Sequence, residues 1–441
     1  MNSDTLRILY HYMQTRHLHR WSGREALERW QERRIIRQIR RIRAVSAFYR
    51  DLWKGLPDHA WRQFPIIDKQ IMMEHFDRLN TVGIRCEEAM KLALQAEQTR
   101  DFQPLLNGVT VGLSSGTSGN RGLFLVSPQE QAAWTGTVLA KLLPGGLKRE
   151  ARIAFFLRAN SNLYESVRKG KLQFRYFDLM CPLEEHLEQM NQYRPTIWVA
   201  PASMLRLLAE EYAAGRLNVQ PQRIIAVAEV LDPLDQQYIE QTFEQTVHQV
   251  YQCTEGFLGA TCAHGTIHLN EDLVCIEKEY IDRDSRRFMP IITDFSRITQ
   301  PIIRYRLNDI LTESAAPCLC GSPFTAIERI EGRYDDILYI RHNQHHQKIP
   351  LFPDLVTRAI IAASPHISHY RVIQQAEDRL EIAYRLTDTD EASAVVEQSI
   401  QNRIETICQG LHGIPPHIRF TAYDFTPGPV KLRRVERRWN I

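Results

Sequence analysis

The sequence lacks the hallmarks of a membrane-spanning or exported protein. No apolar run approaches the roughly 20 residues needed to cross a bilayer, and Met1–Arg20 contains no apolar core of a secretory signal. The net charge is only +3 over 441 residues, which argues against nucleic acid as the main partner. We therefore expect a cytoplasmic protein whose eight cysteines are thiols or metal ligands rather than disulfides.

The two familiar phosphate-binding fingerprints are also missing. There is no G-x-x-x-x-G-K-[ST] loop and no Rossmann glycine pattern. Instead, Ser114–Gly122 packs four hydroxyl residues and three glycines between two apolar runs. Glycines let backbone N–H groups approach phosphates, and hydroxyls donate to phosphate oxygens. Alone, such a loop is either a flexible connection or a polyphosphate site, and the rest of the chain must decide.

Strand and helix patterns predict an α/β fold with two domains. Residues 152–251 alternate strands with helices, one of which begins at Asp232-Pro233, and this order predicts a mostly parallel sheet covered by helices. Polar clusters follow two of the strands, at Ala228-Glu229 and at Gln252–Gly256, where open sheets bind ligands. Beyond about Asp335 a small α+β domain follows.

Arginine is concentrated between Arg24 and Arg50. Nine arginines face three glutamates there, and Ile35, Ile39 and Ile42 recur at helical spacing. The segment is either a helix for an anionic partner or an amphipathic surface helix docked by its isoleucine stripe, and we favour the second interpretation.

Four residues could hold a metal. Cys318 and Cys320 lie 56 and 52 residues after Cys262 and His268, respectively, and three thiolates with one imidazole suit a closed, structural zinc site. His264 is a competing ligand, and incidental cysteines are the alternative. His342, His345 and His346 are expected to form a solvated loop rather than a second metal site.

Five motifs in order resemble the adenylate-forming superfamily of acyl-CoA synthetases, peptide-synthetase adenylation domains and luciferases, in particular its phenylacetate–CoA ligase-like branch. They are Ser114–Gly122, Ala228-Glu229, Tyr251-Gln252-Cys253-Thr254-Glu255, Tyr305-Arg306-Leu307-Asn308-Asp309 and Gly332-Arg333-Tyr334-Asp335-Asp336. The resemblance covers nearly the whole chain. It implies a large adenylating domain, residues 1–334, and a small mobile C-terminal domain, residues 335–441, with the hinge near Asp335.

The resemblance also implies roles for individual residues. Lys431 would bridge the substrate carboxylate and the α-phosphate, Thr254 would contact that phosphate, and Glu255 would bind Mg²⁺. Some relatives carry a cluster similar to Cys262, His268, Cys318 and Cys320. The residues implied to bind ATP are Ser114, Ser115, Gly116, Thr117, Ser118, Gly119, Ala228, Glu229, Tyr251, Asp309 and Arg333.

The chain departs from the family pattern at several places. Arg121 stands where relatives often have a lysine, Gln252 and Asn308 replace glycines, and the segment after the hinge, Arg341–Lys348, has no glycine. These changes spare the adenylation half of the pattern better than the half that binds the thiol arm.

We therefore expect ATP- and Mg²⁺-dependent activation of a carboxylic acid, aromatic by analogy with the branch, as an acyl-adenylate. Coenzyme A or the phosphopantetheine of a carrier protein would then accept the acyl group. Two alternatives remain open: the adenylate passes to a separate reductase or amide-forming enzyme, or the protein only binds nucleotide on a degenerate ligase fold. The sequence identifies neither the acid nor the oligomeric state.

Overall fold

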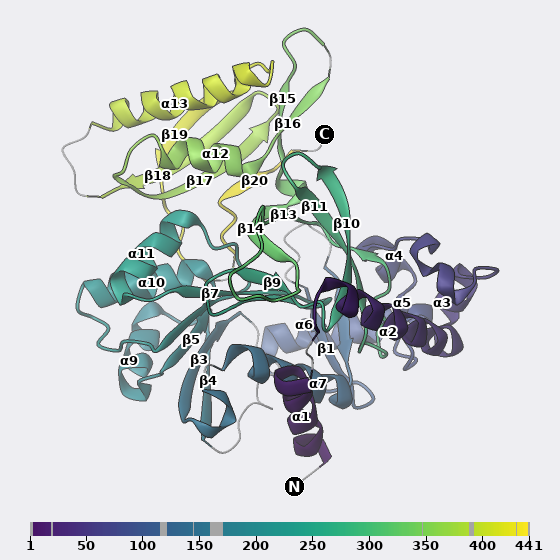
Figure 1. Ribbon diagram of the computed structural model, residues 1–441. Helices are drawn as coiled ribbons and strands as arrows, with labels where there is room; N and C mark the ends of the chain where they lie inside the picture. Colours follow the sequence, from purple (N-terminus) through teal and green to yellow (C-terminus); the bar gives the residue numbers. More distant parts are fainter. Residues whose placement is uncertain are drawn as a thin grey trace.

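The computed structural model describes residues 3–18, 21–114, 121–143, 145–158, 171–345, 347–387, 392–428 and 430–439. These residues form a large N-terminal part built on one long sheet, with a smaller C-terminal domain stacked on it (Figure 1). Separate buried cores in the two parts confirm the predicted α/β class.

The large part begins with helices. α1 (Ser3–Met13) continues into a π-helical turn (Gln14–Leu18) and packs along α7 (Pro128–Leu142). Gly136 permits this contact, because a Cβ there would lie 2.3 Å from the Ile8 carbonyl oxygen. The next helices are α2 (Arg24–Val45), α3 (Ala47–Leu52), a 3₁₀ turn (Asp58–Gln63), α4 (Lys69–Glu74), α5 (Phe76–Leu79) and α6 (Cys86–Thr99). α2 buries Ile35, Ile39 and Ile42, so the predicted isoleucine stripe is confirmed.

The predicted parallel run forms half of a twelve-stranded sheet. Its strands are β4 (Leu172–Asp178), β3 (Ala151–Leu157), β5 (Ile197–Ala200), β6 (Arg223–Ala226) and β7 (Val247–Cys253), paired in that order. α9 (Leu183–Tyr193), α10 (Ala202–Ala213) and α11 (Pro233–Phe243) pack on one face, and α1 and α7 pack on the other. Asp232 caps α11 as expected, accepting a hydrogen bond from the Leu234 amide at 2.9 Å.

The same sheet continues as an antiparallel half that the sequence did not indicate. Its strands are β8 (Gly256–Thr261), β9 (Ile267–Leu269), β10 (Val274–Asp282), β11 (Arg287–Asp294), β12 (Tyr305–Arg306), β13 (Asp309–Glu313) and β14 (Ala326–Arg333). The sheet is thus mixed, because short connections such as β7–β8 and β10–β11 fold back as hairpins instead of crossing over through a helix. α2 packs against this half.

Past a 3₁₀ turn (Tyr334–Asp336), the C-terminal domain has its own core. A hairpin of β15 (Leu338–Arg341) and β16 (Lys348–Leu351) precedes a four-stranded sheet of order β19-β18-β17-β20. The remaining elements are α12 (Pro353–Ile361), β17 (Ile367–Ala376), β18 (Arg379–Leu386), α13 (Ser393–Gly410), β19 (His417–Ala422) and β20 (Val435–Arg437).

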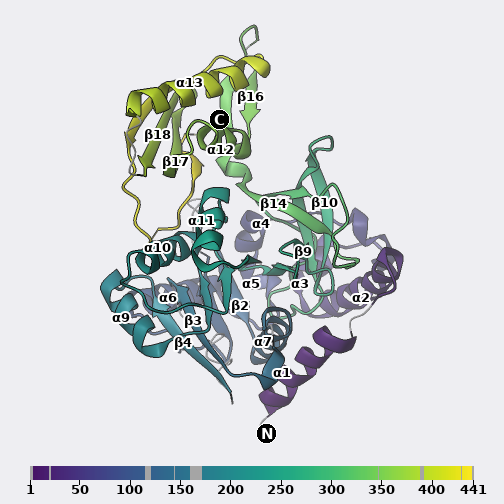
Figure 2. The ribbon, with the colours of Figure 1, turned by 60° about the vertical axis from the view of Figure 1, so that its left-hand side comes forward.

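A long connection between β19 and β20 leaves the C-terminal domain and reaches the large part near α10 and α11, as both ribbon views show (Figures 1 and 2). We call its described residues, 423–428 and 430–434, the strap. At its end, Arg434 pairs with Asp235 of α11. Tyr370 of β17 donates to Asp232 beside the same helix. The strap therefore joins the two domains where the predicted site lies.

Candidate functional site

The Ser/Gly-rich loop lies between two paired antiparallel strands, β1 (Thr110–Leu113) and β2 (Leu123–Val126). The Ser114 amide donates to the Gly122 carbonyl at 2.8 Å, and the Ser114 hydroxyl oxygen accepts from the Gly122 amide at 2.8 Å. The predicted residues Ser115, Gly116, Thr117, Ser118 and Gly119 lie outside the described residues. The structure therefore shows the base of the predicted phosphate loop.

The cation at this base is Lys69, which the sequence did not single out. Lys69 Nζ donates to the Ser114 hydroxyl oxygen at 3.2 Å. Burial and the nearby Arg333 and Arg121 lower the pKa of Lys69, and Glu255 opposes that shift. Arg121 is held by a two-pronged ion pair with Glu97 of α6. Lys69, at the start of α4, is therefore a second cation beside Arg121 at the base of the loop.

Thr254 and Glu255 follow β7 and form one oxygen-rich group. The Thr254 hydroxyl donates to Glu255 Oε2 at 2.8 Å, and the Tyr305 hydroxyl donates to Glu255 Oε1 at 2.9 Å. Arg297 holds the Thr254 carbonyl at 2.8 Å. A carboxylate beside a hydroxyl is a donor set of hard oxygens, and it fits Mg²⁺.

Asp309 and Arg333 are brought together by strand register. They are opposite one another in the β13–β14 pair. The buried Tyr251 donates its hydroxyl to Asp309 Oδ2 at 2.7 Å. Burial raises the pKa of Asp309, while Tyr251, Arg333 and Lys431 oppose the rise. Motifs far apart in the sequence thus meet around one carboxylate.

Glu229 follows β6 and has a different environment from the one expected beside an adenine. Ala228 has a φ of +65°, a strained conformation for alanine that turns the chain sharply at the strand end. The Glu229 side chain is only 1% exposed. Its carboxylate accepts from the amides of Ser203 at 3.1 Å and Leu432 at 3.0 Å, and it pairs with Arg158 at 3.4 Å.

These contacts hold the strap on both sides of Lys431. Arg158 Nε donates to the Gly428 carbonyl at 2.7 Å, and Glu229 binds the Leu432 amide. Burial, reinforced by Arg158 and Arg333, lowers the pKa of Lys431 to about 8, whereas Glu229 and Asp309 favour its charged form. The predicted lysine therefore lies among the other predicted residues, although it comes from the C-terminal domain.

One cavity of about 2710 Å³ is lined by all of these groups. It exceeds the 300–1,000 Å³ typical of a site for one small ligand. Part of it is an apolar slot between α7 and the sheet, which the sequence did not reveal. The slot is lined by Trp134, Val138, Leu142, Phe155, Leu157, Val199 and Val227. In the sequence these residues look like ordinary core positions, because only packing leaves them partly open to a cavity.

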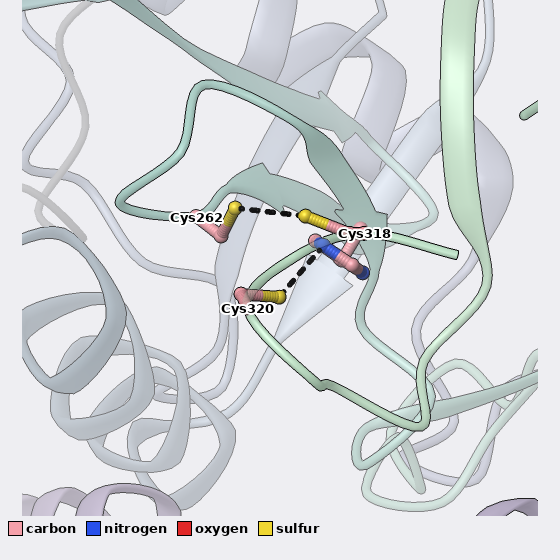
Figure 3. A group of neighbouring side chains, drawn as sticks. Cys262, Cys318 and Cys320 are labelled. Carbon is pink, nitrogen blue, oxygen red and sulfur yellow. Dashed lines mark hydrogen bonds between the residues drawn. The ribbon is translucent and has the colours of Figure 1, made fainter. Parts of the chain in front are cut away.

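The predicted metal cluster is assembled away from this cavity (Figure 3). Cys262 directly follows β8, His268 lies in β9, and Cys318 and Cys320 lie between β13 and β14. Their ligand atoms all lie within 4.8 Å of one another, and His264 is not among them in the described part of the chain. Cys262 Sγ and Cys318 Sγ are 3.7 Å apart, close to the roughly 3.8 Å edge that Zn–S bonds of about 2.3 Å give in a tetrahedron.

The outer contacts of the cluster also suit a metal. His268 Nε2 lies 3.3 Å from Cys320 Sγ, and its Nδ1 lies 3.2 Å from the Phe324 carbonyl oxygen. Metal-ligating histidines commonly direct their second nitrogen to such an acceptor. Hydrogen bonding by the Cys320 backbone lowers the pKa of Cys318 to about 6, whereas burial raises the pKa of Cys320 to about 11.

No family model matches the chain, and no curated protein matches it. Among solved structures, 2-hydroxyisobutyryl-CoA ligase with 2-HIB-AMP, in the postadenylation state, superposes with a TM-score of 0.70 at 16% identity, covering 93% of this chain and 89% of that one. GH3.15 acyl acid amido synthetase superposes with a TM-score of 0.57 at 12% identity, covering 89% of this chain and 86% of that one. The amide bond synthetase McbA from Marinactinospora thermotolerans superposes with a TM-score of 0.53 at 13% identity, covering 73% of this chain and 67% of that one. The chain has the fold of the adenylate-forming enzymes.

The same ligase superposes with a TM-score of 0.57 in an open conformation and of 0.54 in the thioesterification state. No described helix is long and apolar enough to cross a membrane.

Proposed function

We propose that the protein activates a carboxylic acid with ATP, forming an acyl-adenylate and releasing pyrophosphate. The observation that carries this proposal is the position of Lys431, fixed by Arg158 and Glu229 beside Asp309 and Arg333. The reaction brings two anions together, a carboxylate and the α-phosphate, and a fixed cation between them offsets their repulsion.

We assign the other residues to binding different parts of ATP. The Ser114–Gly119 loop and Lys69 are assigned to the β- and γ-phosphates, and the Thr254 hydroxyl to the α-phosphate. Asp309 would accept hydrogen bonds from the ribose hydroxyls, with Arg333 beside it. Ala228 and Tyr251 would flank the adenine. Glu255 would bind Mg²⁺, which neutralises phosphate charge when bound.

We propose a different part for Glu229 from the one that the resemblance implied. Its carboxylate is occupied by Ser203, Leu432 and Arg158. We therefore assign Glu229 to holding the strap rather than to contacting the adenine. The acid would occupy the apolar slot, where Trp134 and Phe155 support the expectation of an aromatic substrate.

We further propose that residues 335–441 turn about Asp335 to present the adenylate to an acceptor thiol of coenzyme A or a carrier protein. Asp335 accepts a hydrogen bond from the Asn308 side chain at 2.5 Å, so the hinge residue is tied to the Asp309 strand in the present arrangement. Amide formation is the second candidate, because two of the similar structures are amide-forming synthetases.

Exchange of labelled pyrophosphate into ATP tests the proposal. We expect exchange that depends on Mg²⁺ and on an added acid, when aryl and fatty acids are screened as a panel. ATP binding without exchange for any acid contradicts the proposal and supports a protein that only binds nucleotide. With an active acid, coenzyme A and amines can be compared as acceptors.

A further inference from the structure

α2 holds a large share of the protein's positive charge. It contains eight arginines and three glutamates, whereas the whole chain has a net charge of only +3, so the rest of the chain is slightly acidic. All three glutamates lie in the first half of the helix. The second half, from Arg33 to Val45, has six arginines and no acidic residue.

These arginines form a row on the solvent side of α2. Arg33, Arg37 and Arg41 are exposed and follow one another at four-residue spacing, which places them on one face of a helix. Among the described residues, none of the three forms a hydrogen bond or an ion pair with a carboxylate. Arg37 also helps to lower the pKa of Arg34, after the larger effect of burial. The row is thus positive charge that the described protein does not neutralise.

α1 also exposes apolar side chains. Leu6, Leu9, Tyr10 and Met13 are 54%, 40%, 60% and 45% exposed. Their spacing of three and four residues makes a stripe along the helix. The other side of α1, with Tyr12, packs against α7. Helix packing therefore accounts for one face of α1 and leaves the opposite face in solvent.

The two helices lie near one another, and Arg34 directly follows Arg33 of the row. Tyr10 of α1 is close enough to Arg34 of α2 to raise its pKa. Both ribbon views place α1 and α2 on the same side of the large part (Figures 1 and 2). We define the α1–α2 face by Leu6, Leu9, Met13, Arg33, Arg37 and Arg41.

We propose that the α1–α2 face docks on the surface of an anionic lipid bilayer. Guanidinium groups attract the phosphates of anionic lipids, and apolar side chains next to them can enter the boundary between headgroups and acyl chains. Nucleic acid would engage the arginines but would gain little from the exposed leucines and methionine. A bilayer with anionic headgroups uses both kinds of side chain.

Docking would also bring a membrane close to the cavity described above. His11 and Gln14, next to the apolar stripe, line that cavity together with Arg34. An apolar acid dissolved in the bilayer would then have a short path to the apolar slot. This consequence rests on the proposed function, whereas docking itself does not.

Sedimentation with vesicles tests the docking, and it needs no ATP or acid. The full-length protein should bind vesicles of equal parts phosphatidylcholine and phosphatidylglycerol, and should not bind pure phosphatidylcholine vesicles. The triple variant Arg33→Glu, Arg37→Glu, Arg41→Glu should weaken binding on the order of 100-fold, because each basic side chain near an anionic surface contributes roughly fivefold. Leu6→Ser, Leu9→Ser, Met13→Ser should weaken it about 10-fold.

A matched variant separates docking from a general effect of charge. Arg379, Arg403 and Arg419 are exposed on the C-terminal domain, and reversing them to Glu makes the same change of charge. Circular dichroism confirms that each variant folds. The proposal is overturned if the protein ignores anionic vesicles, if the control triple weakens binding equally, or if the face instead holds two copies together in light scattering without binding vesicles.

Discussion

Lys431 shows how one residue couples pH to the proposed reaction. It must be protonated to bridge two anions, and its pKa of about 8 in the nucleotide-free enzyme means that this form is lost as pH rises through 8. We expect kcat/KM for pyrophosphate exchange to fall above about pH 8. Lys431→Arg should lower the rate and remove that fall, since a guanidinium stays charged. Lys431→Ala should lower kcat/KM for pyrophosphate exchange by at least about 100-fold.

The same pKa predicts the opposite trend for stability. The folded state lowers the pKa from 10.5, so folding favours the neutral amine. Protonated Lys431 therefore lowers the free energy of unfolding below pH 8, and this loss of stability is relieved as pH rises from about 8 towards 10.5.

The kinetic prediction has its own contradicting outcome. A fall of kcat/KM above pH 8 that Lys431→Arg shares with the wild type would contradict the role assigned to Lys431.

Motifs in the sequence identified some residues of the site, but they missed residues whose contacts depend on how distant segments pack. Asp309 and Arg333 were both assigned from motifs, and β13–β14 register places them opposite one another. Lys69 was missed, because nothing local to it in the sequence shows that its amine lies beside the distant Ser114. Arg158 was missed as well, since its partners are the strap and Glu229.

At the scale of elements, the cysteine cluster joins the loop before β14 to the β8–β9 hairpin, next to the pairing of β9 with β14. Cys262 and His268 come from the β8–β9 hairpin, and Cys318 and Cys320 come from the loop before β14. We propose that the cluster binds structural Zn²⁺. Protein purified without chelators should then contain about one zinc per chain. Cys318→Ser should lose the metal and lower Tm on the order of 5 °C.

The matched control is Cys181→Ser, which removes an exposed thiol outside the cluster and should change neither quantity. Metal content near zero in the wild-type protein, with a Tm unaffected by chelators, would show that the four residues are incidental neighbours.

Periodicity predicted elements better than it predicted their pairing. The structure has the predicted alternation of strands and helices between 152 and 251, because apolar patterns mark these elements. The antiparallel half of the sheet went unpredicted, since its order depends on which hairpins stack, and short strands such as β9 and β12 carry little pattern of their own. The site depends on that order, because β12, β13 and β14 carry Tyr305, Asp309 and Arg333.

At the scale of the whole molecule, ion pairs at the strap and away from it join the two domains. Arg434 and Asp235 pair beneath the C-terminal sheet, and Arg287 of β11 pairs with Asp354 of α12 at 2.8 Å. Glu229 and Arg158 fix the strap itself. Because these pairs are largely buried, removing one partner leaves a charge without its counter-ion. Single substitutions can therefore shift the arrangement without unfolding either core.

Glu229→Gln tests this view most directly. The amide keeps the shape of the side chain and can still accept from Leu432, but it leaves Arg158 and Lys431 as two like charges without the carboxylate between them. We expect pyrophosphate exchange to fall about 10- to 100-fold, whereas transfer from a supplied acyl-adenylate to the acceptor stays nearly unchanged, because the proposed second step needs the strap released. Glu211→Gln is the matched control: Glu211 is a buried carboxylate of α10 that pairs with Arg216, away from the strap. If Glu229→Gln slows both half-reactions equally, or leaves exchange unchanged, the strap is not what places Lys431.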